Sequence, residues 1–300
     1  MKKKLSIILA GTLVLGSLLA GCGGKEAEKP APEQPKTEKP APSPATPPAP
    51  APAEGKYADG IYFAQGEMNE KSGWQYNVTL KVEGGKITDA NWNGSNIKSG
   101  PDKKSLDKAG KYGMVEKGGA QAEWYQQAEK IEKFLIEKQD PAAITYDDKG
   151  NTDVVSGVSI HVNDFVEIAQ KALQAGPTQP GPYKDGGYHA EGEKDPKSGW
   201  ASTVDLTVAN GKVIAVYFSG VNDKGEDKQT VSKEGKYGMK AGGAQSEWHE
   251  QIQKVEQHYL ENQGAGSLSF KEGKTDAITG VSVHVQEFFQ LADKALEGAK

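Results

Sequence analysis

The sequence repeats itself at the scale of a whole domain. The stretch "DGIYFAQGE" begins at Asp59 and "DGGYHAEGE" begins at Asp185, an offset of 185 − 59 = 126 residues. Three further stretches, "KSGW", "GKYGM" and "GGAQ", recur at nearly the same offset. A period of this length is that of a folded domain and not of a short solenoid repeat. We therefore expect two tandem domains at residues 57–175 and 183–300, joined by a Gly/Pro-rich linker at 176–182.

The first half of each copy has the pattern of a β-hairpin. Apolar and polar residues alternate over residues 78–82 and again over 204–208, which is the period of a half-buried strand. Gly84-Gly85 follows the first of these stretches and Asn210-Gly211 follows the second. Asn-Gly is a strong signal for a type I′ hairpin turn, so we expect the chain to reverse at both places.

The second half of each copy has the pattern of helices. Apolar residues recur at helical spacing from Trp124 and again from Val162 in the first copy, and from Trp248 and Val285 in the second. A loop rich in lysine and glycine separates the hairpin from these helices in both copies. We expect an α+β fold built twice, in which each domain is an antiparallel sheet with helices packed against it.

The N-terminus has the features of an export signal. Residues 2–4 are lysines, and residues 5–19 are an apolar stretch too short to span a membrane comfortably. Residues 1–21 end in Leu-Ala-Gly before Cys22, which resembles a bacterial lipobox. The resemblance implies cleavage before Cys22, acylation of its thiol, and a protein anchored by lipid to the extracellular face of the cell membrane. A plain secretory signal with an incidental cysteine is the alternative.

Composition narrows the classes of site that the rest of the chain can build. Residues 22–56 begin with Cys22 and are dominated by proline and alanine, which favours an extended stalk over a packed core. The net charge of -5 argues against nucleic acid as the main partner. Cys22 is the only cysteine, so disulfides within the chain and cysteine-based metal sites are excluded. The chain has no arginine, so an anion site must use lysine, backbone N–H groups or a covalent bond.

A short polar turn occurs in both copies, just before the last helical stripe. It reads "DVVSGVS" from Asp153 to Ser159 and "DAITGVS" from Asp276 to Ser282. One interpretation is structural: each serine caps the last helix, and the preceding glycine adopts a positive φ. The other is chemical: an exposed hydroxyl at a helix start can carry a phosphoryl group that meets the free N–H groups there. The residues alone leave both interpretations open.

The turn and its surroundings resemble a known family. "DVVSGVS" and "DAITGVS" are similar to the Asp-x-x-Ser/Thr-Gly-Ala-Thr/Ser motif of FMN-binding domains, and the order of the other stretches is similar as well. In that family a flavin transferase links FMN through its phosphate to the last residue of the motif. Both copies depart from the motif at one position, where Val158 and Val281 replace alanine.

The resemblance implies a set of site residues in each copy. Ser159 and Ser282 would carry FMN as a phosphoester, and the aromatic side chains of the two "GKYGM" loops would contact the flavin. Trp74, Trp124, Trp200 and Trp248 are further candidates for ring contact, with core packing as the alternative, and His161 and His284 are expected in the first turn of the last helix. We expect no metal site and no catalytic side chains. The expected cofactor-binding residues are Ser159, Ser282, Asp153, Asp276, Ser156, Thr279, Gly157, Gly280, Tyr112 and Tyr237.

The function implied by the resemblance is electron transfer outside the cell. Lipobox-bearing relatives include pheromone-precursor-like lipoproteins and flavoproteins of extracellular electron transfer in Gram-positive bacteria. The expected partners are a flavin transferase, a membrane donor that oxidises quinol, and an extracellular electron acceptor. The alternative is a surface lipoprotein of the same fold that binds a ligand or a partner protein without covalent flavin.

Overall fold

The computed structural model describes residues 55–300. The predicted signal peptide, Cys22 and all but the end of the predicted stalk lie outside these described residues. Within them, no helix is both long enough and apolar enough to cross a membrane.

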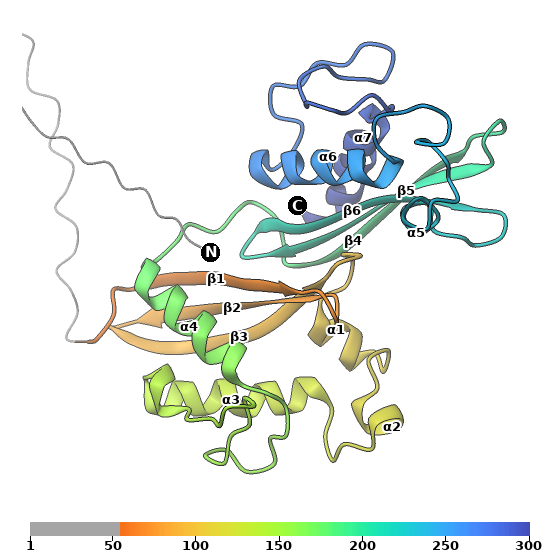
Figure 1. Cartoon of the computed structure of the whole chain (residues 1–300). Helices are drawn as coiled ribbons and strands as arrows, with labels where there is room; N and C mark the ends of the chain where they lie inside the picture. The colour runs from red at the N-terminus through yellow and green to blue at the C-terminus, as the bar shows by residue number, and fades with distance from the viewer. Residues whose placement is uncertain (1–54) are drawn as a thin grey trace, which may run out of the picture. The chain divides into compact units, whose positions relative to one another are not determined.

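The first copy forms a three-stranded antiparallel sheet followed by helices (Figure 1). The strand order is β1-β2-β3, so each strand pairs with the next one along the chain. The helix α4 packs on β1 and β2, and α3 packs on β3. The elements are β1 (Gly60–Asn69), β2 (Trp74–Glu83), β3 (Lys86–Asn96), α1 (Lys103–Lys108), α2 (Met114–Gly118), α3 (Trp124–Lys138), the 3-10 helix η1 (Pro141–Ala143) and α4 (Asn163–Ala175).

The second copy repeats this arrangement. The strand order is β4-β5-β6, α7 packs on β4 and β5, and α6 packs on β6. The elements are β4 (Gly186–Lys194), β5 (Trp200–Ala209), β6 (Lys212–Asn222), α5 (Lys228–Lys233), α6 (Trp248–Asn262), α7 (Gln286–Leu296) and the 3-10 helix η2 (Glu297–Ala299). The α+β class built twice is therefore confirmed.

Each copy has its own hydrophobic core between the sheet and the helices. The alternating residues Val78, Leu80 and Val82 of β2 are buried against apolar residues of α3 and α4. Val204, Leu206 and Val208 of β5 are buried in the same way against α6 and α7. Burying one side chain of this size is worth roughly 1.5–3 kcal/mol, so these stripes fix which face of each sheet meets the helices.

The two hairpin turns are confirmed, with the backbone that a type I′ turn requires. Asn210 and Gly211 have φ of 50° and 68°, and Gly84 and Gly85 have φ of 59° and 72°. Positive φ at both central residues matches the twist of the flanking strands. Glycine accepts this conformation freely and asparagine tolerates it, which is why these residue types occupy the turn.

The last helix of each copy begins later than the sequence indicated. Helix α4 has Val162 as its N-cap and α7 has Val285, with no side-chain capping bond at either. Ser159 and Ser282 therefore lie three residues before the N-cap, and His161 and His284 lie one residue before it instead of in the first turn. The prediction that these serines cap the helix is wrong, and so is the expectation that their hydroxyls lie at the helix start beside its free N–H groups.

Candidate functional site

The serines of the repeated turn are held by a glutamine of the preceding helix. Gln127 on α3 accepts hydrogen bonds through Oε1 from the backbone N–H of Ser159, at 2.7 Å, and from its hydroxyl, at 3.2 Å. Gln251 on α6 makes the same two contacts with Ser282, also at 2.7 and 3.2 Å. Both glutamines are 2% exposed, whereas both serines are exposed. A buried amide thus fixes the backbone of each turn and leaves the serine facing solvent.

Sequence reasoning missed these two glutamines, although a signal for them was present. Each lies three residues after the helix-opening tryptophan, Trp124 or Trp248, and so on the same helical face. A polar residue on an apolar face in both copies indicates a buried hydrogen bond, because an unpaired polar group there would cost roughly 1–3 kcal/mol.

The glycine of each turn has the positive φ that the sequence indicated. The φ values are 73° at Gly157 and 78° at Gly280. A lysine ammonium lies against each turn: Lys130 Nζ donates to the carbonyl of Gly157 at 3.1 Å, and Lys254 Nζ donates to that of Thr279 at 3.3 Å. A Cβ at either glycine would also press on that ammonium. The positive φ is what favours glycine in the turn, because a flexible lysine side chain can move away from an added Cβ.

The acidic and hydroxyl residues of the motif are exposed. Asp153, Asp276, Ser156 and Thr279 all face solvent. A hydrogen bond at the start of each turn involves the preceding threonine instead. The hydroxyls of Thr152 and Thr275 each accept from the backbone N–H two residues further along, at 3.3 Å in both copies. These two threonines, 7% and 3% exposed, were also missed.

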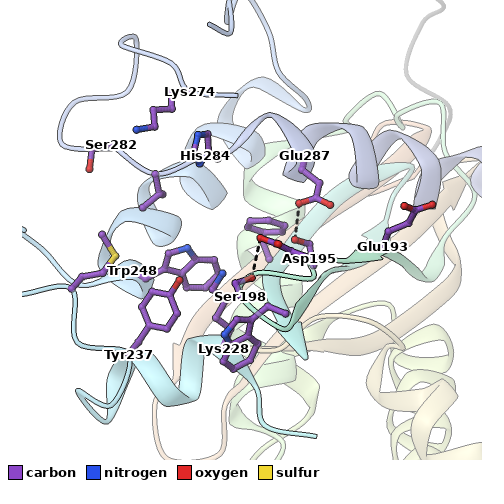
Figure 2. Close-up of a pocket in the computed structure, with 15 residues that line it drawn as sticks. Glu193, Asp195, Ser198, Lys228, Tyr237, Trp248, Lys274, Ser282, His284 and Glu287 are labelled. Atoms are coloured by element: carbon purple, nitrogen blue, oxygen red, sulfur yellow. Dashed lines mark hydrogen bonds between the residues drawn. The ribbon is translucent and has the colours of Figure 1, made fainter. Parts of the chain in front are cut away.

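A cavity of about 510 Å³ opens beside Ser282 in the second copy (Figure 2). Its wall includes three large aromatic side chains, from Trp200 at the start of β5, Tyr237 in the "GKYGM" loop and Trp248 at the start of α6. Trp200 and Tyr237 meet edge to face with ring centroids 6.4 Å apart, and Tyr237 lies 6.3 Å from Trp248. Four predicted ring-contact or cofactor residues thus share one cavity with His284: Ser282, Tyr237, Trp200 and Trp248.

Charged groups of both signs border this cavity. Ser282, Lys274 and His284 lie on one side of it in Figure 2, and Glu193, Asp195 and Glu287 lie on the other. The hydroxyl of Ser202 donates to Glu287 Oε2 at 2.7 Å, and that of Ser198 donates to Asp195 at 3.1 Å. Nine of the fifteen residues that line the cavity are polar or charged, so the aromatic rings form only part of its wall.

A lysine lies among the aromatic rings of each copy, fully buried in the first and half-buried in the second. Lys228 Nζ is 4.7 Å from the ring centroid of Trp248 and 5.2 Å from that of Tyr237, and burial lowers the pKa of this ammonium. In the first copy Lys103 is 0% exposed, and its Nζ donates to the hydroxyl of Tyr112 at 2.8 Å. Burial lowers the pKa of Lys103 to about 7. Aromatic faces stabilise an ammonium that no carboxylate contacts directly.

The aromatic residues of the first copy are packed together. Trp124 is 3% exposed and Trp74 is 7% exposed, and Trp248 of the second copy is 4% exposed, so the core-packing alternative holds for all three. Tyr112 is half-buried and meets Trp74 edge to face at 6.1 Å. Among the described residues of both copies, no group of three or more His, Cys, Asp or Glu side chains is arranged to hold a metal ion.

Comparisons with known proteins give two structural neighbours. No family model matches the chain, and no curated protein matches it. A solution NMR structure of a Clostridium thermocellum protein is 50% identical over 39% of this chain and 90% of its own length, with a TM-score of 0.32. A crystal structure of a Clostridium perfringens protein is 28% identical over 39% of this chain and 87% of its own, with a TM-score of 0.31. Neither description names a ligand or an activity.

Proposed function

We propose that this chain is a cell-surface lipoprotein that carries FMN covalently and passes electrons between a membrane donor and an extracellular acceptor. FMN would be joined as a phosphoester to Ser282, and to Ser159 in the first copy. Cys22 would hold the lipid that anchors the protein to the extracellular face of the cell membrane.

One observation supports this proposal above the others. The exposed Ser282, the last residue of the FMN-domain-like motif, borders a cavity of about 510 Å³ that also contains aromatic side chains. Sites for small organic ligands have volumes of about 300–1,000 Å³, so a flavin-sized ligand fits this volume. Trp200, Tyr237 and Trp248 supply aromatic surface, and the lysine, serine and acidic side chains make the rest of the wall largely polar.

The valine that departs from the family motif does not cover the acceptor hydroxyl. Val158 and Val281 are partly buried and pack against the hydrophobic cores of their own copies. Ser159 and Ser282 stay exposed beside them. This placement supports attachment at both serines despite the change from alanine to valine.

The residues of the second copy have separate tasks in this proposal. Gln251 fixes the backbone of Ser282, so the acceptor hydroxyl keeps a constant position. Lys274 and His284 border the same side of the cavity as Ser282 and can balance the charge of a phosphate diester. The aromatic walls exclude water and orient a flat ring. Bound flavin itself supplies the redox chemistry, accepting and releasing electrons.

Serine variants test the covalent bond. Full-length protein would be produced with a flavin transferase, denatured in acid, and examined for flavin fluorescence that stays with the polypeptide. We expect the Ser159→Ala and Ser282→Ala variants each to lose part of the bound flavin, and the double variant to lose all of it. Unchanged flavin content in the double variant would refute these two attachment sites.

The same cavity also supports an alternative function, that of a surface module that binds an aromatic ligand without a covalent bond. The hydrogen bond from the Ser282 hydroxyl to Gln251, at 3.2 Å, favours this alternative because it engages the hydroxyl in the folded protein. A colourless polypeptide after denaturation, together with reversible ligand binding before it, would identify this function.

A further inference from the structure

The duplication provides a comparison of two sites within one chain. Tyr76 on β2 and Ser202 on β5 occupy equivalent places, 126 residues apart, and each pairs across the sheet with a glycine, Gly94 or Gly220. Glycine in the neighbouring strand leaves room beside both side chains. In the first copy that room holds a tyrosine ring. In the second copy it holds the smaller Ser202, which donates to Glu287 Oε2 at 2.7 Å, and the Lys228 side chain lies beside Gly220.

In the first copy the Tyr76 ring is stacked on the tryptophan that opens α3. Its centroid lies 5.9 Å from that of Trp124, and the two ring planes are 16° apart. The same ring lies 5.5 Å from Trp92. Nearly parallel aromatic rings at this separation attract each other, so Tyr76 serves Trp124 as a built-in stacking partner.

In the second copy the equivalent Trp248 is 4% exposed, about as buried as Trp124, and only a small part of it borders the cavity. Ser202 and Phe218, which replaces Trp92, line the cavity as well. With serine at position 202, no ring of the chain's own takes the place that Tyr76 takes beside Trp124. A planar aromatic ligand inside the cavity would lie against the half-buried Trp200 and Tyr237 and against the part of Trp248 that borders it.

The lysine beside the aromatic rings is also more buried in the first copy than in the second. Lys103 is 0% exposed, with its Nζ 4.0 Å from the Tyr112 ring and 5.2 Å from the Tyr76 ring. Lys228 is only half-buried, and its Nζ lies 5.2 Å from the Tyr237 ring. The cluster of rings around the ammonium is therefore closed in the first copy and opens to the cavity in the second.

We propose that the cavity of the second copy is a binding site for a planar aromatic ring, and that Tyr76 fills the corresponding site of the first copy with its own ring. The identity of the ligand rests on the proposed function. On that basis, the isoalloxazine ring carried by Ser282 enters the cavity of the second copy, and the isoalloxazine ring carried by Ser159 stays outside the core of the first copy. The residue at position 76 or 202 decides whether a ring is admitted, so the two copies hold chemically identical groups in different environments.

Riboflavin tests this proposal because it has the flavin ring but no phosphate, so it cannot form the phosphoester bond. The full chain would be produced without a flavin transferase and titrated with riboflavin, following the quenching of flavin fluorescence. We expect about one riboflavin to bind per chain. Ser202→Tyr should weaken this binding at least tenfold, and Tyr76→Ser should add a second site. Thr203→Tyr is the matched control, because it adds the same ring at the next residue of β5, on the opposite face of the sheet.

Three results would overturn the proposal: no riboflavin binding by the unsubstituted chain, equal binding by the Ser202→Tyr variant, or no second site after Tyr76→Ser. If Ser202→Tyr fails to fold, as judged by its thermal unfolding, the Tyr76→Ser variant decides the question alone. Covalent attachment is measured separately on denatured protein that was made with a transferase. If the protein carries no covalent flavin but still binds riboflavin in a way that depends on residue 202, the covalent function is refuted and this site is kept. If the protein carries covalent flavin but riboflavin binding does not depend on residue 202, the site alone is refuted.

Discussion

Glu256 on α6 should make the stability of the second copy fall as the pH rises. Its Oε1 accepts hydrogen bonds from the backbone N–H of Phe218 and from Gln229 Nε2, both at 2.8 Å, and no lysine contacts it. Burial raises the pKa of this carboxyl group to about 8. In the first copy the equivalent Glu132 has an ammonium beside it, with Lys104 Nζ 2.6 Å from Oε1. The substitution Gln229→Lys would bring the same ammonium to Glu256.

The expected magnitude follows from the pKa of Glu256. The folded protein keeps a proton that the unfolded chain releases between pH 4.5 and about 8, so the free energy of unfolding decreases across this window. A difference of about 3.5 pH units at ~1.4 kcal/mol each sets an upper limit of about 5 kcal/mol. Burial raises the pKa of Glu132 as well, while Lys104 lowers it, so a lysine offsets only part of the effect. We expect Gln229→Lys to remove about half of the pH-dependent loss.

Denaturant unfolding at pH 5 and at pH 8 measures this loss. The original chain, Gln229→Lys and Glu256→Gln would be compared, with hydrogen exchange at the Phe218 amide reporting on the second copy specifically. We expect a large loss of stability at pH 8 in the original chain, a smaller one in Gln229→Lys and almost none in Glu256→Gln. Equal losses of stability between pH 5 and pH 8 in all three proteins would show that Glu256 is ionised at both pH values. That result would refute a raised pKa for Glu256.

Two further predictions concern buried polar groups. Gln251→Met removes the acceptor for the Ser282 amide, so we expect a loss of about 1–3 kcal/mol in the free energy of unfolding and faster hydrogen exchange at Ser282. Gln127→Met is the matched variant and should affect the first copy only. An unchanged exchange rate at Ser282 in Gln251→Met would contradict the contact. The stability of the first copy should rise between about pH 7 and pH 10.5, because the unfolded chain protonates Lys103 there and the folded protein does not. Lys103→Met should flatten this rise in denaturant titrations, and an unchanged slope would argue against a depressed pKa for Lys103.

The hairpins and the long helices could be predicted from the sequence because their patterns are local. The alternation over residues 78–82 and the Asn210-Gly211 pair each carry enough information to place a strand and its turn. The strands β1 and β4 were missed because glycine and polar residues break their alternation, and pairing with β2 and β5 stabilises them instead. The short helices α1, α2 and α5 lie in the stretch whose lysine and glycine content predicts a loop, and each is only five or six residues long, too short for a helical pattern to show.

The candidate site was only partly predictable, because its geometry depends on contacts that are distant in the sequence. The motif identified Ser282, and the repeated "GKYGM" stretch identified Tyr237, and both do border one cavity. The start of the last helix was placed too early, because an amide 31 residues away, on Gln251, holds the serine outside the helix. Ser202 lines the cavity, and nothing in that strand's own pattern distinguishes its position from that of the tyrosine at 76.

Peptide mass spectrometry can show directly whether FMN is attached to Ser282. The full chain would be isolated from cells that contain a flavin transferase, digested, and searched for the peptide that contains Ser282. We expect this peptide to carry the added mass of FMN less one water, with fragment ions that place it on the Ser282 side chain. A peptide found only with a free hydroxyl at Ser282 would refute covalent attachment there.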